Sequence, residues 1–166
     1  FASALTHAIE RDADLLVTID ADGQFDPADI EKLTAPIVGG LADFATASRF
    51  LDPSLTPQMP WLKHYGNRQM SRLISRLTGR RFHDVSCGMR CYNRRAMLSL
   101  NLLGSFTYTQ EVFLNLAFQG QRIEEVPVAV GPRLHGESRM ARNLWKYALQ
   151  TSRIIFRAYR DYKPMQ

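Results

Sequence analysis

The stretch LLVTIDADGQFDP, residues 15–27, constrains the fold of this chain more than any other part of the sequence. Its first five residues are apolar or β-branched, which is typical of a strand that is covered on both faces of a sheet. The run then ends on Asp20, and Asp22 and Asp26 follow closely. A buried strand that ends on clustered carboxylates predicts either an acidic turn or a site that holds a cation.

Helical and strand patterns alternate along the rest of the chain. Asp26 and Pro27 are typical of a helix start, with Asp26 as the N-cap and Pro27 at the first helical position. The alternation predicts an α/β domain in which helices cover a mostly parallel sheet. The expected strands are residues 15–19, 43–48 and 122–130, and the expected helices are about 1–10, 27–38, 61–77, 106–118 and 143–162, with a short helix near Asn93.

The composition is that of one globular domain and excludes a disordered chain. Hydrophobic residues make up 45% and charged residues 22% of the 166 residues. The only cysteines, Cys87 and Cys91, have neither the spacing nor the His partners of a zinc site, so we expect two reduced thiols. The formal net charge of +5 is concentrated in residues 133–166, which hold eight Lys/Arg against two Asp/Glu. No apolar run approaches the roughly 20 residues of a membrane-spanning helix.

The acidic strand end is a candidate metal site. In an open α/β sheet, ligands bind beyond the carboxyl ends of the strands, which is where Asp20 lies. Asp22 and Gln24 continue its register, because side chains of an extended chain alternate with a period of two. Such oxygen ligands suit Mg²⁺ or Mn²⁺, which keep further positions for water and phosphate. Phe25 and Pro27 argue against a calcium-binding EF-hand loop, whereas a plain acidic turn stays open.

Five motifs follow one another in an order that indicates a family. They are ADLLVTIDADGQFDPADI, ASRF, HDVSCGMRCYNRRAM, QEVFLNLAFQGQRIEEVPV and RLHGESRM. With them the chain resembles glycosyltransferase family 2, and within it the polyprenyl-phosphate glycosyltransferases similar to dolichol-phosphate mannose synthase. The resemblance covers most of the chain and implies the Rossmann-like GT-A fold of nucleotide-diphospho-sugar transferases. It also implies that Asp20, Asp22 and Gln24 bind the divalent metal that holds the donor diphosphate.

The resemblance implies roles for two further segments. Asp84 resembles the carboxylate on the acceptor side, where it is a catalytic residue or orients the acceptor, and Arg90 resembles a phosphate-binding residue. Glu111, in a Gln-Glu pair at a helix start, resembles a catalytic residue near the donor sugar. A loop carboxylate that caps a turn remains the alternative for Asp84. For Glu111 the alternative is an exposed acid that complements a helix N-terminus.

A basic loop and a basic helix complete the expected site. Arg133, Ser138 and Arg139 resemble the family's Arg-x-x-Gly-x-Ser-Lys loop, which closes over the donor diphosphate and the acceptor phosphate. Arg139 stands where the family usually has Lys. Residues 141–166 form a second unit, a basic amphipathic helix that we expect to lie on an anionic membrane surface. A plain surface helix and a nucleic-acid-binding helix are the alternatives, and we expect no nucleic acid partner.

Together these features predict an enzyme. Residues 1–140 resemble part of a GT-A catalytic domain whose nucleotide-binding N-terminal portion is missing, so the isolated fragment is expected to be inactive. The expected reaction is metal-dependent transfer of a hexose from a nucleotide-sugar to a polyprenyl phosphate, at the cytoplasmic face of the cytoplasmic membrane. Two alternatives stay open: a family 2 transferase with a soluble glycan or protein acceptor, and a non-catalytic domain that binds nucleotide or anionic lipid.

Overall fold

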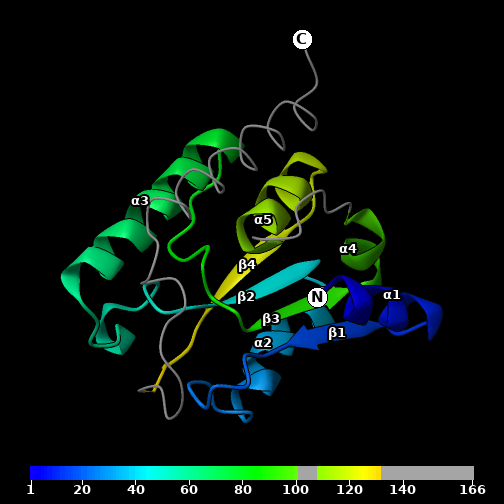
Figure 1. Cartoon of the computed structure of the whole chain (residues 1–166). Coiled ribbons are helices and arrows are strands. Elements are labelled where there is room, and N and C mark those ends of the chain that lie inside the picture. Colours follow the sequence, from blue (N-terminus) through cyan, green and yellow to red (C-terminus); the bar gives the residue numbers. More distant parts are fainter. Residues whose placement is uncertain (101–107, 132–166) are drawn as a thin grey trace.

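The structure is a computed structural model that describes residues 1–100 and 108–131 (Figure 1). Helices and strands alternate through these residues. In chain order the elements are α1 (Ala2–Glu10), β1 (Leu15–Thr18), α2 (Asp29–Val38), β2 (Phe44–Ser48), the 3-10 turn η1 (Pro53–Leu55), α3 (Trp61–Thr78), β3 (Arg90–Asn93), α4 (Arg94–Ser99), α5 (Tyr108–Phe118) and β4 (Ile123–Pro127).

The four strands form one mixed sheet in the order β1-β3-β2-β4. Strands β2 and β4 pair in parallel, and β3 runs antiparallel to both of its neighbours, β1 and β2. Three strands therefore point the same way, as a mostly parallel sheet requires, and β3 is inserted between them in the opposite direction. The α/β class expected from the sequence is confirmed, and the sheet is more mixed than expected.

The sheet is packed between two apolar layers. On one face the side chains of Phe44 and Tyr92 pack with residues of α1, α3, α4 and α5. On the other face Ala45 and Cys91 pack with Leu33 and the rest of α2. The alternation of neighbouring residues between the two faces follows from the two-residue period of a strand. Figure 1 shows α2 on one side of the sheet and α3 and α5 on the other.

Three local expectations are corrected by the structure. Helix α2 begins at Asp29 with Ala28 as its N-cap, because the Asp26 carboxylate accepts the N–H of Ala28 (2.9 Å) and forms a separate turn before the helix. Strand β1 is half-buried along its length and not fully covered, since it pairs on one side only within the described residues. Strand β3 was not expected at all. In contrast, the Asn93 side chain caps α4 near the predicted start.

At the end of the sheet opposite to Asp20, an ion pair between the buried Asp43 and the half-exposed Arg122 fixes the start of β2 to the start of β4. The Asp43 carboxylate accepts hydrogen bonds from Nε and Nη2 of Arg122 (3.1 and 3.0 Å) and from its backbone N–H (2.9 Å). The side-chain amide of Asn93 donates to the same carboxylate (3.0 Å), which brings in the end of β3. The hydrogen bonds from Arg122 outweigh the effect of burial and lower the pKa of Asp43 far below its ordinary value of 3.8.

The variant Asp43→Asn tests this anchor. We expect a loss of about 1–3 kcal/mol in the free energy of unfolding at neutral pH, because the donors of Arg122 and Asn93 lose a charged, buried acceptor. Because the folded state lowers the pKa of Asp43, the ionised carboxylate stabilises the fold at pH values above its ordinary pKa. This stabilisation is lost as the pH falls through the folded-state pKa. The difference between wild type and variant should therefore shrink as the pH falls below 3.8. Urea unfolding followed by circular dichroism across the acid range measures both effects.

The exposed residue Asp14 offers the control, since Asp14→Asn should change the unfolding curve little at any pH. An Asp43→Asn variant as stable as wild type at neutral pH would contradict the anchoring role.

Candidate functional site

The candidate site lies where the parallel strands end. Asp20 follows β1, Arg49 follows β2, and Gly131 follows β4. Because β3 runs the other way, its start at Arg90 and the preceding Gly88 lie at the same edge of the sheet. The edge thus collects residues that are far apart in the sequence, in the place where open α/β sheets bind their ligands.

Asp20 lies directly against Gly88. A Cβ atom added to Gly88 would be 2.0 Å from Oδ2 of Asp20, so only a glycine leaves room for the carboxylate. The Thr18 hydroxyl also donates to the Gly88 carbonyl (3.3 Å), which ties the end of β1 to the same glycine. The acidic strand end and the Ser-Cys-Gly-Met-Arg segment, two motifs found separately in the sequence, therefore meet in the structure.

A buried ion pair joins Arg49 to Asp84 beside this contact. The Asp84 carboxylate accepts hydrogen bonds from Nε (2.6 Å), Nη2 (2.9 Å) and the backbone N–H (3.2 Å) of Arg49, and from the N–H of Ser86 (3.0 Å). The Asp84 side chain is completely buried and that of Arg49 is 13% exposed. Burial opposes the charge on Arg49, but the hydrogen bonds and attraction of Asp84, together with the more distant charge of Asp20, raise its pKa.

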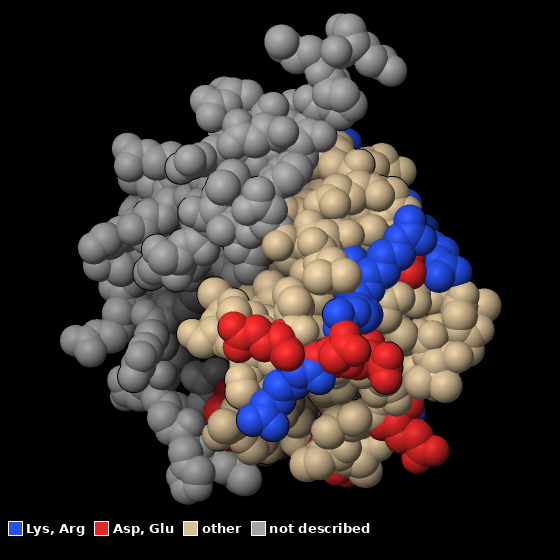
Figure 2. Space-filling model, turned by 90° about the vertical axis from the view of Figure 1, so that its right-hand side faces the viewer, with Lys and Arg blue, Asp and Glu red and all other residues tan. Residues whose placement is uncertain are grey.

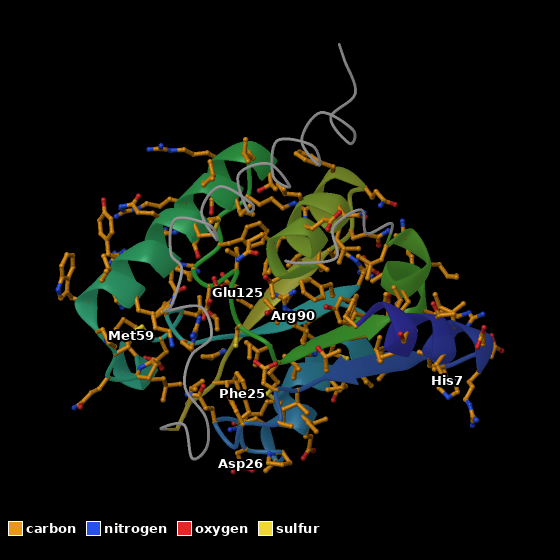
Figure 3. All side chains as sticks on the ribbon, viewed as in Figure 1. His7, Phe25, Asp26, Met59, Arg90 and Glu125 are labelled. Carbon is orange, nitrogen blue, oxygen red and sulfur yellow. The ribbon has the colours of Figure 1, made fainter. Side chains whose placement is uncertain are left out.

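Glu125 on β4 binds the backbone of the segment that contains Asp84. Its carboxylate accepts the backbone N–H groups of His83 and Asp84 (both 2.8 Å) and contacts Nδ1 of His83 (2.8 Å). Figure 3 shows Glu125 in the interior of the molecule, close to where β4 and the loop before β3 meet. Glu125 is therefore a positioning residue: it fixes Asp84, which in turn fixes Arg49.

Arg90 is buried and connects this loop to helix α5. Its guanidinium donates to the carbonyl oxygens of Cys87 (2.8 Å), Thr109 (3.1 Å) and Val85 (3.3 Å), and it lies over the ring of Phe113. The side chain has no exposed surface. This geometry favours a positioning role for Arg90 over the phosphate contact expected from the sequence.

The Gln-Glu pair lies in the first turn of α5 and is almost completely buried. Gln110 and Glu111 are each 1% exposed, so the alternative of an exposed acid at a helix start is wrong for Glu111. Thr109 carries the carbonyl that Arg90 binds, and Gln110 accepts a hydrogen bond from its hydroxyl (2.7 Å). The pair is thereby linked to the Asp84 loop through Arg90.

Gln24 connects the acidic loop to the chain that follows β4. Its side-chain amide donates to the Gly131 carbonyl (3.1 Å), and the Gly131 N–H donates to the Gln24 carbonyl (2.9 Å). Asp22 accepts the N–H of Gln24 (3.2 Å). The basic loop expected after Gly131 thus starts beside Gln24. Its predicted residues Arg133, Ser138 and Arg139, and the helix expected over 141–166, lie outside the described residues.

The two cysteines are buried free thiols. Burial, with a contribution from the Asp84 charge, raises the pKa of Cys87 to about 12, and burial raises the pKa of Cys91 to about 11. Both therefore stay protonated at neutral pH and act as small apolar side chains. Within residues 1–100 and 108–131, no three His, Cys, Asp or Glu side chains converge as a preformed metal cage.

A basic cleft adjoins the Arg49–Asp84 pair. It has a volume of about 510 Å³ and opens between α3, the loop that contains η1, and the segment before Asp84. Phe50 and His83, the chain neighbours of Arg49 and Asp84, both line it. The lining contains four arginines, Arg68, Arg72, Arg76 and Arg81, and two histidines, His64 and His83, but no acidic side chain. The cleft therefore favours a ligand that carries negative charge.

Sequence reasoning found neither Arg49 nor Glu125 as site residues. Arg49 stands in the ASRF motif at the end of β2, and its position after a buried strand was the available signal. Glu125 follows another glutamate in a strand whose sequence pattern alternates, and acidic side chains in such a strand are normally solvated. Its role depends on a loop 41 and 42 residues earlier in the chain, which no local pattern reveals.

The α/β sheet with polar residues at the carboxyl ends of its strands is an arrangement that binds ligands at those ends. Comparison with known proteins assigns the family. The family model "Glycosyl transferase family 2" matches residues 1–100. The chain belongs to this family. Its fold agrees with the crystal structure of glucosyl-3-phosphoglycerate synthase from Mycobacterium tuberculosis, with a TM-score of 0.59 and 13% identity, over 90% of this chain and 50% of that one.

Two relatives have names that contain a dolichol or polyprenol lipid. The chain is 34% identical over 60% of its length to UDP-N-acetylglucosamine–dolichyl-phosphate N-acetylglucosaminyltransferase of Methanococcus voltae, covering 39% of that protein. It is 27% identical over 80% of its length to polyprenol monophosphomannose synthase of Mycolicibacterium smegmatis, covering 51% of that protein. The chain thus spans about half the length of these relatives. The resemblance to polyprenyl-phosphate glycosyltransferases within family 2 is confirmed.

The variant Glu125→Gln tests the positioning of Asp84. One carboxylate oxygen becomes an amide nitrogen, which cannot accept the N–H groups of His83 or Asp84. We expect the variant to lose about 1–3 kcal/mol of stability, because a buried donor loses its partner. Amide hydrogen exchange should accelerate at residues 83 and 84 in particular.

Glu124→Gln is the matched control, because Glu124 is the exposed neighbour on the same strand. Unchanged exchange at residues 83 and 84 in Glu125→Gln would contradict the proposed hold on Asp84.

Proposed function

We propose that this chain is part of an enzyme that transfers a hexose from a nucleotide-sugar to a polyprenyl phosphate, with a divalent metal, at the cytoplasmic face of the cytoplasmic membrane. The names of two relatives, one a dolichyl-phosphate N-acetylglucosaminyltransferase and one a polyprenol monophosphomannose synthase, support the acceptor class. The geometry around Asp84 supports it independently.

The hydrogen bonds of Asp84 are the observation that carries the proposal. Four N–H groups occupy the lone pairs of this carboxylate, so it is not arranged to take a proton from an alcohol. A phosphate acceptor is already ionised near neutral pH and needs no such base. The adjoining cleft lined by four arginines offers the positive charge that a phosphate requires. This combination favours a phosphate over a glycan or protein hydroxyl as acceptor.

The residues at the strand end fit a divalent metal through the chemistry of their donors. Asp20 and Asp22 supply two carboxylates, and the Gln24 amide has an oxygen besides the nitrogen that binds Gly131. Mg²⁺ commonly takes one or two carboxylates and leaves its other positions to water and substrate phosphate. Two carboxylates are therefore enough. When bound, the ion would stabilise the charge that develops on the leaving diphosphate.

The proposed reaction is a substitution at C1 of the sugar. The bond from C1 to the nucleoside diphosphate breaks, the diphosphate leaves with the electron pair, and an oxygen of the acceptor phosphate forms the new bond. Arg49, fixed by Asp84 at the edge next to Asp20, would attract the phosphates. Arg90 would keep the Asp84 loop and the Gln110-Glu111 turn in register. Arg133, Ser138 and Arg139 would cover the phosphates from the following loop.

Donor binding provides the test of this proposal. Isothermal titration of UDP and GDP, with and without Mn²⁺, is carried out on the full-length protein. Metal-dependent binding of one nucleotide should be abolished by Asp20→Ala/Asp22→Ala. It should weaken by about tenfold or more in Gly88→Ala, because the added methyl group displaces the Asp20 carboxylate. Folding should survive in Gly88→Ala, since a side chain and not the backbone moves aside.

Asp26→Ala serves as the matched control in the same loop, because the Asp26 carboxylate accepts the N–H of Ala28 in the turn before α2. Binding of neither nucleotide under any metal condition would overturn the proposal, as would wild-type binding by the Asp20/Asp22 variant.

A further inference from the structure

Helix α3 exposes large apolar side chains on the face that turns away from the core. Trp61 is 78% exposed, Tyr65 55%, Leu62 49% and Leu73 40%. These are half of the eight large hydrophobic residues that the structure exposes among its described residues. An ordinary surface helix buries its apolar stripe, as α3 also does with Ile74. The helix therefore carries a second apolar stripe on the outside.

Positive charge accompanies this outer stripe. Helix α3 contains Lys63, Arg68, Arg72 and Arg76 and has no acidic residue. At 100° per residue, Trp61, Tyr65, Arg72 and Arg76 fall within an arc of about 60°. The face toward which α1 and α4 lie looks different: there, basic and acidic side chains lie side by side (Figure 2), as in the pair of Arg94 with Asp12. A helix of one sign with exposed aromatic rings is thus a local property of α3.

We propose that the outer face of α3, formed by Trp61, Leu62, Tyr65, Arg72, Leu73 and Arg76, docks on an anionic lipid bilayer. Trp and Tyr rings suit the headgroup region, because one end of each ring is apolar and the other polar. Arginines beside them attract the anionic headgroups, whereas a second copy of this chain would bring the same positive charge against itself. The charge of the face therefore selects a negatively charged occupant.

The placement of this face has a consequence for the cleft. His64, Arg68, Arg72 and Arg76 of the same helix line it, so docking along α3 brings the cleft to the lipid surface. An acceptor whose phosphate lies at that surface could then enter without leaving the bilayer. This consequence rests on the proposed function; the docking itself does not.

Vesicle binding by the full chain tests the docking. The probes are vesicles of phosphatidylcholine alone and of phosphatidylcholine with an equal amount of phosphatidylglycerol. Co-sedimentation should occur with the anionic vesicles and fall with added salt. The variant Trp61→Ser/Tyr65→Ser should bind them at least about tenfold more weakly, because two aromatic side chains no longer enter the interface. The control Val38→Ser/Leu98→Ser changes equally exposed side chains of α2 and α4 and should bind like wild type.

Fluorescence separates α3 from the other basic helix. Trp61 and Trp145 are the only tryptophans of the sequence, so Trp145→Phe leaves Trp61 as the reporter. Its emission should shift to the blue on anionic vesicles. Binding without such a shift would overturn the proposal and assign the membrane contact to residues 141–166. Equal binding by wild type and Trp61→Ser/Tyr65→Ser would overturn it too, as would a dimer that this variant abolishes.

Neither readout requires turnover. Failure to bind nucleotide would reject the proposed transferase but not the docking of α3 on lipid. Absence of vesicle binding would reject the docking but not the proposed transferase.

Discussion

The buried pair of Arg49 and Asp84 is the interaction on which the rest of the site depends. Removing two charges from water is costly, and only close hydrogen bonds in good geometry offset that cost. Here the guanidinium and the carboxylate meet through two parallel bonds of 2.6 and 2.9 Å, and two backbone N–H groups satisfy the remaining acceptor positions. The pair joins the end of β2 to the loop before β3, and so it determines where both segments lie at the sheet edge.

Other contacts extend this constraint across the sheet. Glu125 fixes the same loop from β4, Arg90 fixes it to the start of α5, and Gly88 lets Asp20 approach it from β1. Each polar residue is held by another residue from a different strand or helix. Such second contacts are what keep a binding site in one geometry. At the opposite ends of the strands, Asp43 and Arg122 join the starts of β2 and β4. Side-chain contacts therefore stabilise the sheet at both ends of its strands.

Much of the fold could be predicted from the sequence because its signals are local. Trp61 to Leu77 has helical periodicity and ends at Gly79, whose left-handed backbone (φ 69°) terminates α3 as expected. Strand β3 was not predicted because Arg90 and Asn93, the residues at its ends, are polar and typical of a loop. Arg90 is nevertheless buried, because its guanidinium contacts backbone carbonyls from other segments. The Asp26-Pro27 pattern gave the wrong helix start, since an aspartate side chain can close a turn as well as cap a helix.

The candidate site was predictable only in part. Asp20, Asp84 and Glu111 emerged from motifs, each of which is a short stretch of chain. The pairing of Arg49 with Asp84 spans 35 residues and that of Glu125 with Asp84 spans 41, and these distances in sequence carry no periodic signal. Only the tertiary structure shows that the Asp84 carboxylate accepts three hydrogen bonds from Arg49. The sequence left open whether Asp84 takes a proton or orients the acceptor, and this contact favours an orienting role.

Transfer of labelled sugar from a nucleotide-sugar to a polyprenyl phosphate, measured in the full-length protein and in Arg49→Lys, tests the central claim most directly. Lysine keeps the charge but cannot make the paired hydrogen bonds to Asp84. We expect a lipid-linked sugar product with wild type, and turnover reduced by about a hundredfold in the variant while the protein remains folded. Absence of the product with any nucleotide-sugar, or full turnover in Arg49→Lys, would contradict it.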